Sequence, residues 1–463
     1  MISDSTIRKL TDVVGRENIL TSKEERLCYA YDATNQQFLP DAVLFPRSAG
    51  EISEVMRLAN SEGFPVIPRG AGSGASGGSL PVEGGVVLSL EQMNRIIGID
   101  PGNLTAVVEP GVVNVDLQIE AEKHGLFFPP DPSSLKFCTI GGNIAECAGG
   151  PRAVKYGVTR DYILSLEVVL PTGEIIETGV RTLKGVVGYD LTRLMVGSEG
   201  TLGVVTQATV RLLPLPEAVK TMLAVFRDLS DAGRAVASIM NSKILPSALE
   251  LMDMVSIRCV EESLNLGIPE AAEAILLIEL DGEEGLVERQ SEAVKGLCTE
   301  RNAVSVKVAE GKMEVRELWR VRRAIPPALI KIKPDKINED VVVPRSRILD
   351  LITGVQGIAK EKKLTIASFG HAGDGNIHVN VMVDRGDPDE ARRGKEAVEE
   401  VFKLTIDLGG TISGEHGVGT AKAPYIGMEL KPPAIDVMRR IKKTLDPKGV
   451  LNPGKIFPVT ESR

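Results

Sequence analysis

The sequence predicts an α+β protein with more than one domain. Its 463 residues are enough for roughly two to four domains of ordinary size. Helical stretches alternate with short runs of β-branched residues along the chain. The glycine density then falls after residues 214–216, which marks the beginning of a second α+β domain.

The first part of the chain combines helices, short strands and two long glycine-rich loops. Helical periodicity covers residues 7–14 and 51–62. The glycine-rich loops span residues 70–85 and 139–150, and loops of this length in a compact domain are usually functional. Strands are expected between these features, at residues 42–45, 86–88, 106–108, 164–170 and 204–212.

The second part of the chain alternates helices and strands with fewer glycines. Helices are expected at residues 231–241, 284–299 and 314–325, and Pro326 and Pro327 should end the last of them. Strands are expected at residues 222–226, 274–280 and 304–308. Residues 434–445 form an amphipathic helix that a Pro/Gly-rich tail follows.

The composition excludes several classes of protein. The net charge is −9 with Lys and Arg interspersed among acidic residues, so nucleic-acid binding has no electrostatic support. The N-terminus has no signal-peptide pattern, and the longest apolar runs are far shorter than a membrane span. Five separated cysteines without a C-x-x-C pair argue against iron–sulfur clusters, cysteine zinc sites and a disulfide framework. We expect a cytoplasmic protein that meets a membrane only through a partner or a surface contact.

Residues 68–78 form a glycine-rich segment directly after a strand-like run at 65–67. Glycines at this density let backbone N–H groups converge on an anion such as a pyrophosphate. The spacing fits neither a Walker loop nor a Rossmann fingerprint, and a flexible linker is the alternative. Two more glycine-rich segments, 139–145 and 197–203, also lie beside predicted strands. Three such segments indicate one large cofactor held mainly by main-chain donors.

Three of the four histidines, His371, His378 and His416, lie within a short stretch of the sequence. A Gly-Asp-Gly-Asn turn separates the first two, and the following strand places His378 and Asn380 on one face. Glu415 adjoins His416. Two histidines and a carboxylate form a usual ligand set for Zn²⁺, Mn²⁺ or Fe²⁺. The alternative is a group of core histidines with satisfied hydrogen bonds, and the pattern alone does not separate ligands from a base. The fourth histidine, His124, follows a helical stretch and should lie at the surface.

The motifs R-G-x-G-S-G, T-I-G-G-N-I-A and G-S-E-G-T-L-G-V-V-T occur in this order in the sequence. They resemble the FAD-binding half of the vanillyl-alcohol oxidase superfamily, in the branch of D-lactate dehydrogenases and glycolate oxidase flavoprotein subunits. The resemblance covers essentially the whole chain. It implies an FAD-binding domain of two α+β subdomains (residues 1–213), an α+β cap with an antiparallel sheet (214–422) and a C-terminal helical segment that returns to the FAD domain (423–463).

The resemblance also assigns residues to FAD. The first segment would bind the pyrophosphate, and the other segments would approach the flavin ring and the adenosine. The first loop contains no His or Cys, so we expect non-covalent FAD. Cys147 stands where relatives often carry Asn, and it either packs or contacts the flavin. The expected FAD-binding residues are Arg69, Gly70, Gly72, Ser73, Gly74, Gly77, Ser133, Gly141, Gly142, Asn143, Ser198, Gly200 and Gly203.

The resemblance separates the roles of the histidines. His371, His378 and Glu415 would bind a divalent metal, His416 would be the general base, and Asn380 would lie beside the substrate. Arg322, three residues after Trp319, would pair with the substrate carboxylate, a task that suits a guanidinium. Lys336 and Asn338 share a strand face and would contact the side-chain end of the substrate.

The implied activity is FAD-dependent oxidation of a short D-2-hydroxy acid, D-lactate or glycolate. Pro326 stands where relatives that take longer diacids carry a hydroxyl residue, which favours a monoacid. The alternatives are a D-2-hydroxyglutarate-type dehydrogenase, a non-catalytic electron-transfer flavoprotein and a metal-dependent hydrolase. Electrons would leave through an electron-transfer flavoprotein, an iron–sulfur subunit or a quinone pool. A homodimer is compatible with this interpretation.

Overall fold

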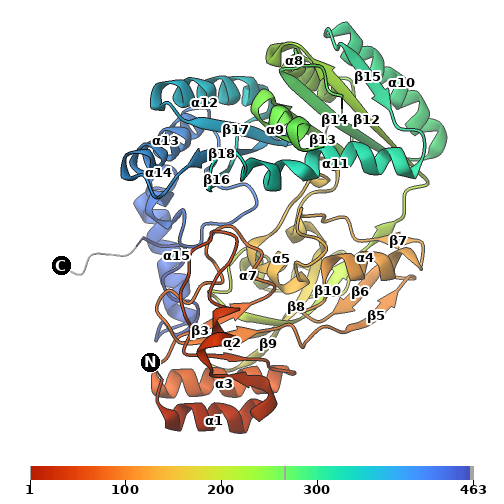
Figure 1. Cartoon of the computed structure of the whole chain (residues 1–463). Helices are drawn as coiled ribbons and strands as arrows, with labels where there is room; N and C mark the ends of the chain where they lie inside the picture. Colours follow the sequence, from red (N-terminus) through yellow and green to blue (C-terminus); the bar gives the residue numbers. More distant parts are fainter. Residues whose placement is uncertain (1, 265–266, 459–463) are drawn as a thin grey trace. The chain divides into compact units, whose positions relative to one another are not determined.

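The computed structural model describes residues 2–264 and 267–458. Within these ranges the chain forms two compact units, each built from separate stretches of sequence. The first unit contains the residues up to Gly149, Val158–Leu215 and the residues from Glu415 onward, and the second unit contains Gly150–Gly157 and Pro216–Gly414. Both units combine helices with sheets (Figure 1), so the predicted α+β class is confirmed.

A four-stranded sheet and two helices form the N-terminal part of the first unit. Helices α1 (Asp4–Val14) and α3 (Ala49–Glu62) each begin after a serine whose side chain accepts a first-turn backbone hydrogen bond. Apolar side chains from both helices and the sheet form one buried core. The strand order is β1 (Ile19–Leu20), β2 (Ala42–Leu44), β4 (Val86–Ser89) and β3 (Val66–Arg69), with β2, β4 and β3 parallel.

The second sheet of the first unit is antiparallel and has five strands. Its order is β5 (Ile96–Asp100), β6 (Thr105–Val108), β10 (Val204–Arg211), β8 (Ile163–Val169) and β9 (Ile175–Gly179). A short pair, β7 (Leu126–Phe127) with β11 (Leu213–Pro214), accompanies it. Short helices complete this unit: α2 (Lys23–Leu27), α4 (Asn114–Glu122), α7 (Leu191–Met195) and α14 (Ile426–Glu429). His124 follows α4 and is exposed, as predicted.

The second glycine-rich segment corrects a sequence prediction. Residues 139–150 were expected to be a loop, but Ile140–Glu146 forms helix α5. The Thr139 side chain caps this helix by accepting a hydrogen bond from the backbone N–H of Gly142 at 3.2 Å. A Cβ at Gly141 would lie 2.6 Å from the Cβ of Pro110, so the close approach of this helix to Pro110 requires a glycine.

The C-terminal segment packs on the first sheet. After helix α15 (Pro432–Leu445), Leu451 forms a parallel bridge with Val66 of β3. The Asn452 side-chain amide donates to the carbonyls of Gly78 and Glu199 at 2.9 and 2.8 Å. This one amide therefore joins the end of the chain to the first and the third glycine-rich segments.

The second unit is built on a seven-stranded antiparallel sheet. Helix α6 (Ala153–Tyr156) also belongs to this unit, and its Lys155 and Tyr156 both donate to Asp281. The strand order is β15 (Ser305–Val308), β12 (Ala218–Phe226), β14 (Ala274–Gly282), β13 (Ala248–Asp253), β17 (Thr365–His371), β18 (Asn376–Val383) and β16 (Asp335–Val342).

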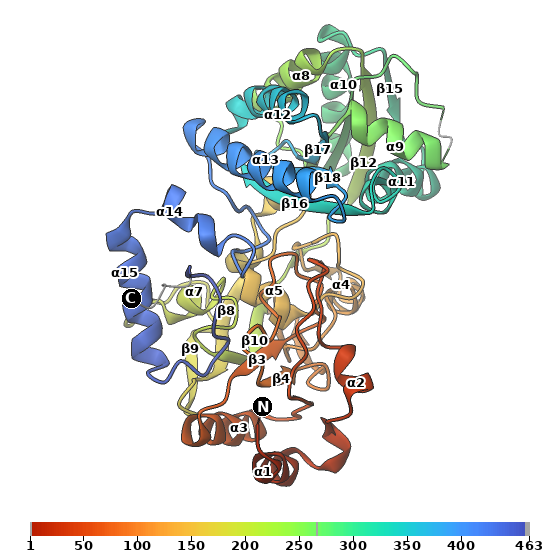
Figure 2. The ribbon, with the colours of Figure 1, turned by 60° about the vertical axis from the view of Figure 1, so that its left-hand side comes forward.

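Helices cover both faces of this sheet (Figures 1 and 2). Helices α9 (Met254–Leu264) and α11 (Lys312–Leu329) pack on one face around a shared apolar core. The other helices pack on the strands from the opposite side: α8 (Leu229–Asn241), α10 (Glu284–Glu300), α12 (Ile348–Lys362) and α13 (Pro388–Asp407). No helix in the described ranges has the length and apolarity needed to cross a membrane.

Helix α11 differs from its prediction. Pro326 and Pro327 were expected to end it, but the helix continues through both prolines to Leu329. The prolines remove backbone hydrogen bonds. The helix nevertheless persists because Ile325, Ala328 and Leu329 are buried in the core against the sheet. Tertiary packing therefore overrides the local signal of the Pro-Pro pair.

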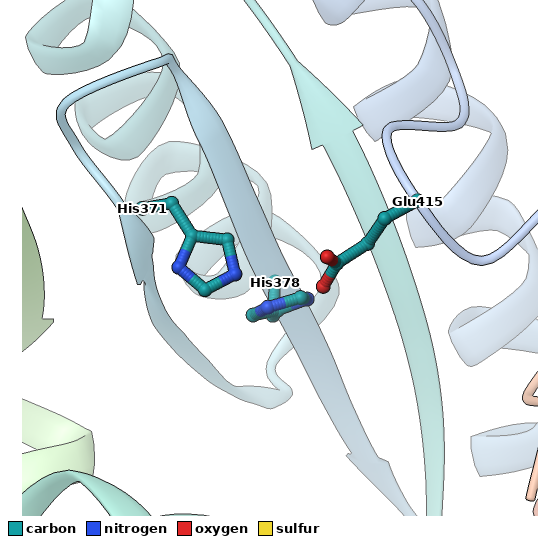
Figure 3. Close-up of side chains that lie close together, drawn as sticks. All are labelled: His371, His378 and Glu415. Atoms are coloured by element: carbon teal, nitrogen blue, oxygen red, sulfur yellow. The ribbon is translucent and has the colours of Figure 1, made fainter. Parts of the chain in front are cut away.

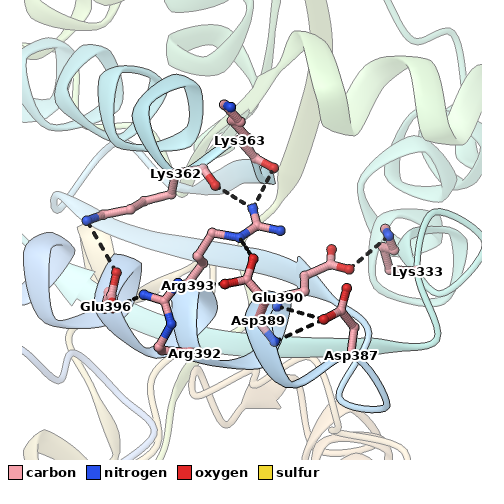
Figure 4. Close-up of polar contacts among 9 residues, drawn as sticks. All are labelled: Lys333, Lys362, Lys363, Asp387, Asp389, Glu390, Arg392, Arg393 and Glu396. Carbon is pink, nitrogen blue, oxygen red and sulfur yellow. Dashed lines mark hydrogen bonds and ion pairs between the residues drawn. The ribbon is translucent and has the colours of Figure 1, made fainter.

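Helices α12 and α13 were not anticipated from the sequence, although Asp387 supplies a start signal. The Asp387 carboxylate accepts from the backbone N–H groups of Asp389 and Glu390, at 2.9 and 3.3 Å. Arg393 then donates to the carbonyl oxygen of Lys362, which connects α13 to the end of α12 (Figure 4). Asp387 therefore helps to begin α13, and Arg393 attaches this helix to α12.

Candidate active site and cofactor loops

The two predicted histidine ligands lie on neighbouring strands of the second unit. His371 ends β17 and His378 lies in β18, and the turn between them is closed by the Gly375 N–H donating to the His371 carbonyl at 3.0 Å. The two imidazole rings meet edge to face with their centroids 5.2 Å apart. His378 shares a strand face with Met382, which belongs to the core under α9 and α11. Both rings are buried.

Glu415 is held beside these histidines by the residue before it. The Gly414 N–H donates to the carbonyl oxygen and to Oδ2 of Asp340 in β16, at 3.0 and 2.9 Å. One side-chain ligand atom from each of His371, His378 and Glu415 lies within 4.8 Å of the other two (Figure 3). Two imidazoles and one carboxylate at this separation fit a divalent ion with open positions for further ligands.

His416, the predicted base, adjoins this cluster. Its Nε2 lies 4.0 Å from Oε1 of Glu415. The segment after it is fixed by Glu199, whose carboxylate accepts from the N–H groups of Val418 and Gly419 at 2.8 and 2.6 Å. Burial raises the pKa of Glu199, and these hydrogen bonds and two lysines oppose that rise. The role of Glu199 was not predicted, although it lies within the third glycine-rich motif.

Glu250 is a further site residue that the sequence did not reveal. It lies in β13 and is completely buried. Its Oε1 lies 2.5 Å from Nδ1 of His371, and its Oε2 accepts from Nε of Arg322 at 2.7 Å. Burial would raise its pKa, but the charges of His371 and Arg322 and their hydrogen bonds outweigh burial and lower it to about 2. A single Glu inside an apolar strand carries no motif that would have identified it.

Arg322, the predicted carboxylate anchor, is buried on the same face of the sheet. Its guanidinium lies over the ring of Phe369, with 4.5 Å between the guanidinium carbon and the ring centroid. The neighbouring Arg320 is exposed and pairs with Glu317 at 3.2 Å, as expected for a solvated residue. Arg322 alone of these two can therefore serve a site beside β17.

The predicted substrate residues Lys336, Asn338 and Asn380 share this face. Asn338 in β16 is the direct cross-strand partner of Asn380 in β18, and Lys336 is the partner of Met382. Both Asn338 and Asn380 have a buried amide oxygen without a hydrogen-bond donor among the described residues. Burial lowers the pKa of Lys336. Buried acceptors that lack donors are costly unless a ligand or water satisfies them.

The first glycine-rich segment contains two glycines in the left-handed region. Gly72 and Gly77 have positive φ values of 65° and 84°. Arg69 supports this loop from within, because its guanidinium donates to the Tyr31 carbonyl at 2.8 Å and to the Ser79 hydroxyl at 3.2 Å. The buried hydroxyl of Ser76 has no hydrogen-bond partner among the described residues. An unsatisfied hydroxyl in a glycine-rich turn fits a polar guest such as a phosphate.

The other predicted FAD residues surround helix α5. Gly70 packs on its start, since a Cβ there would lie 2.4 Å from Oγ1 of Thr139. The third segment, which includes Ser198 and Gly200, packs on its end, where the Glu199 N–H donates to the Ala145 carbonyl at 2.8 Å. A Cβ at Gly203 would lie 2.4 Å from Cγ1 of Val168, so close packing against Val168 explains why a glycine occupies this position. Asn143 is buried, and its amide nitrogen has no hydrogen-bond partner among the described residues. Ser73 and Gly74 lie in the first segment, and Ser133 is exposed.

Cys147 ends helix α5 in the left-handed region, with φ 57°. Burial raises the pKa of its thiol. The side chain is partly buried and free of any disulfide.

Two known protein families match this chain. Residues 40–179 match the family described as "FAD binding domain", so the chain is an FAD-binding protein. Residues 215–456 match "FAD linked oxidases, C-terminal domain". The chain belongs to the FAD-linked oxidase family, and its resemblance to the vanillyl-alcohol oxidase superfamily is confirmed.

Sequence similarity to known proteins extends along nearly the whole chain. The glycolate oxidase subunit GlcD of Bacillus subtilis is 47% identical over 99% of this chain and 97% of its own length. A D-lactate dehydrogenase of Anaerostipes hadrus is 38% identical over 90% of this chain and 89% of its own length. Among solved structures, p-cresol methylhydroxylase shares the fold with a TM-score of 0.82 at 17% identity, covering 98% of this chain and 96% of the other.

Proposed function

We propose that this FAD-linked oxidase converts a short 2-hydroxy acid, D-lactate or glycolate, into the corresponding 2-oxo acid. The observation that carries the proposal is the convergence of His371, His378 and Glu415 beside the sheet face that bears Asn380 and on which Arg322 of α11 is buried. Relatives named glycolate oxidase subunit and D-lactate dehydrogenase support the substrate class.

The residues of this chain would bind and orient the substrate. The guanidinium of Arg322 pairs with the substrate carboxylate. The amide oxygens of Asn338 and Asn380 accept hydrogen bonds from the substrate or its bound water. Lys336 lies two residues before Asn338 on the same strand face, and it would contact the end of the substrate that is remote from the carboxylate.

His416 would remove the proton of the 2-hydroxyl group as general base. As this O–H bond breaks, the C2–H bond breaks with its electron pair and the C2=O double bond forms. When bound, FAD supplies the acceptor for that electron pair, and a divalent ion held by His371, His378 and Glu415 supplies positive charge near the 2-hydroxyl oxygen. We propose Zn²⁺, Mn²⁺ or Fe²⁺, because each of them accepts this mixed ligand set.

We infer that FAD is held without a covalent bond and is reoxidised by a separate carrier. The first loop contains no His or Cys that could tether a flavin. The five cysteines form no disulfide and lie far apart in the sequence, so they provide no cysteine ligand set for an iron–sulfur centre in the part of the chain that the structure describes. An electron-transfer flavoprotein, an iron–sulfur subunit or a quinone would take the electrons, and cysteines without disulfides fit a cytoplasmic location. Release of the flavin by acid precipitation tests the non-covalent attachment.

A visible spectrum recorded without oxygen tests the function. D-lactate or glycolate should bleach the flavin absorbance, whereas L-lactate should leave it unchanged. Removal of the metal with a chelator should slow the bleaching, and added metal should restore it. A colourless protein would contradict the FAD assignment, and a yellow protein that no 2-hydroxy acid bleaches would favour an electron-transfer role. Faster bleaching by D-2-hydroxyglutarate would replace the monoacid with a diacid.

A further inference from the structure

Glu250 contacts both His371 and Arg322, to which the proposed function gives different roles. Its carboxylate oxygens have separate partners, Nδ1 of His371 for Oε1 and Nε of Arg322 for Oε2. The first partner is a proposed metal ligand and the second is the proposed carboxylate anchor. All three side chains are buried on the face of the sheet under α9 and α11.

The contact with Glu250 determines which nitrogen of His371 is available. Because Nδ1 faces the carboxylate, it carries the proton, and Nε2 becomes the lone-pair donor. Figure 3 shows one ring nitrogen of His371 directed toward His378 and the other directed away from it. A carboxylate that accepts from the remote nitrogen fixes the tautomer and the ring orientation of a histidine ligand.

The same carboxylate restrains Arg322. Phe369 lies against the guanidinium, and Glu250 accepts from its Nε, so the guanidinium is held by both stacking and a charged hydrogen bond. An amide in place of the carboxylate offers one oxygen and one NH₂ group. It could accept from either His371 or Arg322 but would present a donor to the other.

We infer that Glu250 is a positioning residue that couples metal binding to substrate binding in this site. It aims Nε2 of His371 at the metal cluster and holds the guanidinium of Arg322 for the substrate carboxylate. This inference rests on the proposed function, because it assumes that the cluster binds a metal and that Arg322 binds the acid.

Glu279 provides a matched control. It is also a buried Glu in the same sheet, on the adjacent strand β14. Its Oε2 accepts from Nε1 of Trp319 and from Oγ1 of Thr221, at 2.7 and 3.0 Å, and neither partner belongs to the proposed site. Glu279→Gln and Glu250→Gln therefore make the same chemical change in the same sheet, and only the second touches the site.

The test measures Zn²⁺ and Mn²⁺ affinity of the purified flavoprotein by competition with a chromogenic chelator. Glu250→Gln should weaken metal binding by about 10- to 100-fold, as loss of such an outer partner usually does. It should also raise KM for the hydroxy acid, whereas Glu279→Gln should leave the metal affinity unchanged. Circular dichroism and flavin content report whether each variant is folded.

A second measurement needs no variant. The chain has only four histidines, so ring-¹⁵N labelling of the wild type gives few signals. With metal bound, His371 should be protonated at Nδ1 and ligated through Nε2. Ligation through Nδ1, or unchanged metal affinity in Glu250→Gln, would overturn the inference about Glu250. A wild-type protein that binds neither metal would instead overturn the proposed metal site, and the inference with it.

Discussion

At the scale of single residues, His416 has the most direct consequence for chemistry. It neighbours Glu415 and lies outside the helices and strands, so we expect its replacement to leave the sheet and the glycine-rich loops in place. We expect His416→Ala to retain FAD but to slow flavin reduction by D-lactate or glycolate by about 10²- to 10⁴-fold, the usual contribution of a general base. Anaerobic stopped-flow absorbance measures this rate. The exposed His124 gives the control, since His124→Ala should behave as wild type. Rapid bleaching in His416→Ala would assign the base to another residue.

Asp253 should make stability depend on pH. Burial raises its pKa from 3.8 to about 6, although the N–H groups of Ser256 and Ser368 donate to it. Between these values the folded protein holds a proton that the unfolded chain has lost, so stability falls as the pH rises through this window. The full effect is about 3 kcal/mol. Above the window the loss remains constant.

Asp253→Asn removes this dependence because an amide does not titrate. The variant loses one acceptor and should be less stable than wild type at pH 4.5. The difference should shrink, or reverse, at pH 7. Melting temperatures of both proteins across this range measure the effect, and a difference that does not vary with pH would contradict the assignment.

At the scale of elements, most regular segments with clear periodicity could be predicted from the sequence. The helix at residues 51–62 and the strands at 86–88 and 204–212 appear within two residues of their predicted ends. The errors arise where packing outweighs local preference. Helix α11 passes through Pro326 and Pro327 because a buried face follows them, and α5 forms over Gly141 and Gly142 because Thr139 caps it.

Helix α5 gives a test of why its glycines are needed. In Gly141→Ala the new Cβ would lie 2.6 Å from Pro110, whereas in Gly142→Ala it would meet only Oγ1 of Thr139 at 3.4 Å. We expect Gly141→Ala to lose about 1–3 kcal/mol of stability through overpacking. Gly142→Ala should change stability much less. Thermal unfolding of both variants makes the comparison, and equal melting temperatures would show that α5 can move away from Pro110.

In the candidate site, too, some residues could be identified from sequence motifs and others only from the packing of the fold. His371, His378, Glu415 and His416 could be identified because they occur in compact motifs. Glu250 could not, because its role follows from sheet order: β13 pairs with β17 and places Glu250 opposite His371. No spacing in the sequence encodes a partner 121 residues away.

At the scale of the whole molecule, Asn452 is a point where three distant parts of the first unit meet. Its amide donates to Gly78 and Glu199, both in or beside predicted FAD loops. Asn452→Ala should lower the melting temperature and weaken FAD binding, because two buried carbonyls lose their donor. Fluorescence of released FAD during dilution measures the affinity. Unchanged retention of FAD would show that the loops keep their positions without this residue.

The bridge between Val66 and Leu451 also has a consequence for biosynthesis. A ribosome makes the parallel strands of the first sheet early, but it makes the segment that pairs with β3 only after the second unit. The second unit is encoded between these parts, as one long insertion and one short one. Its sheet can therefore fold on the nascent chain while the first unit still lacks its last segment. Loading of the flavin would then follow the synthesis of the segment around Leu451, because the first sheet is incomplete until that segment has been made.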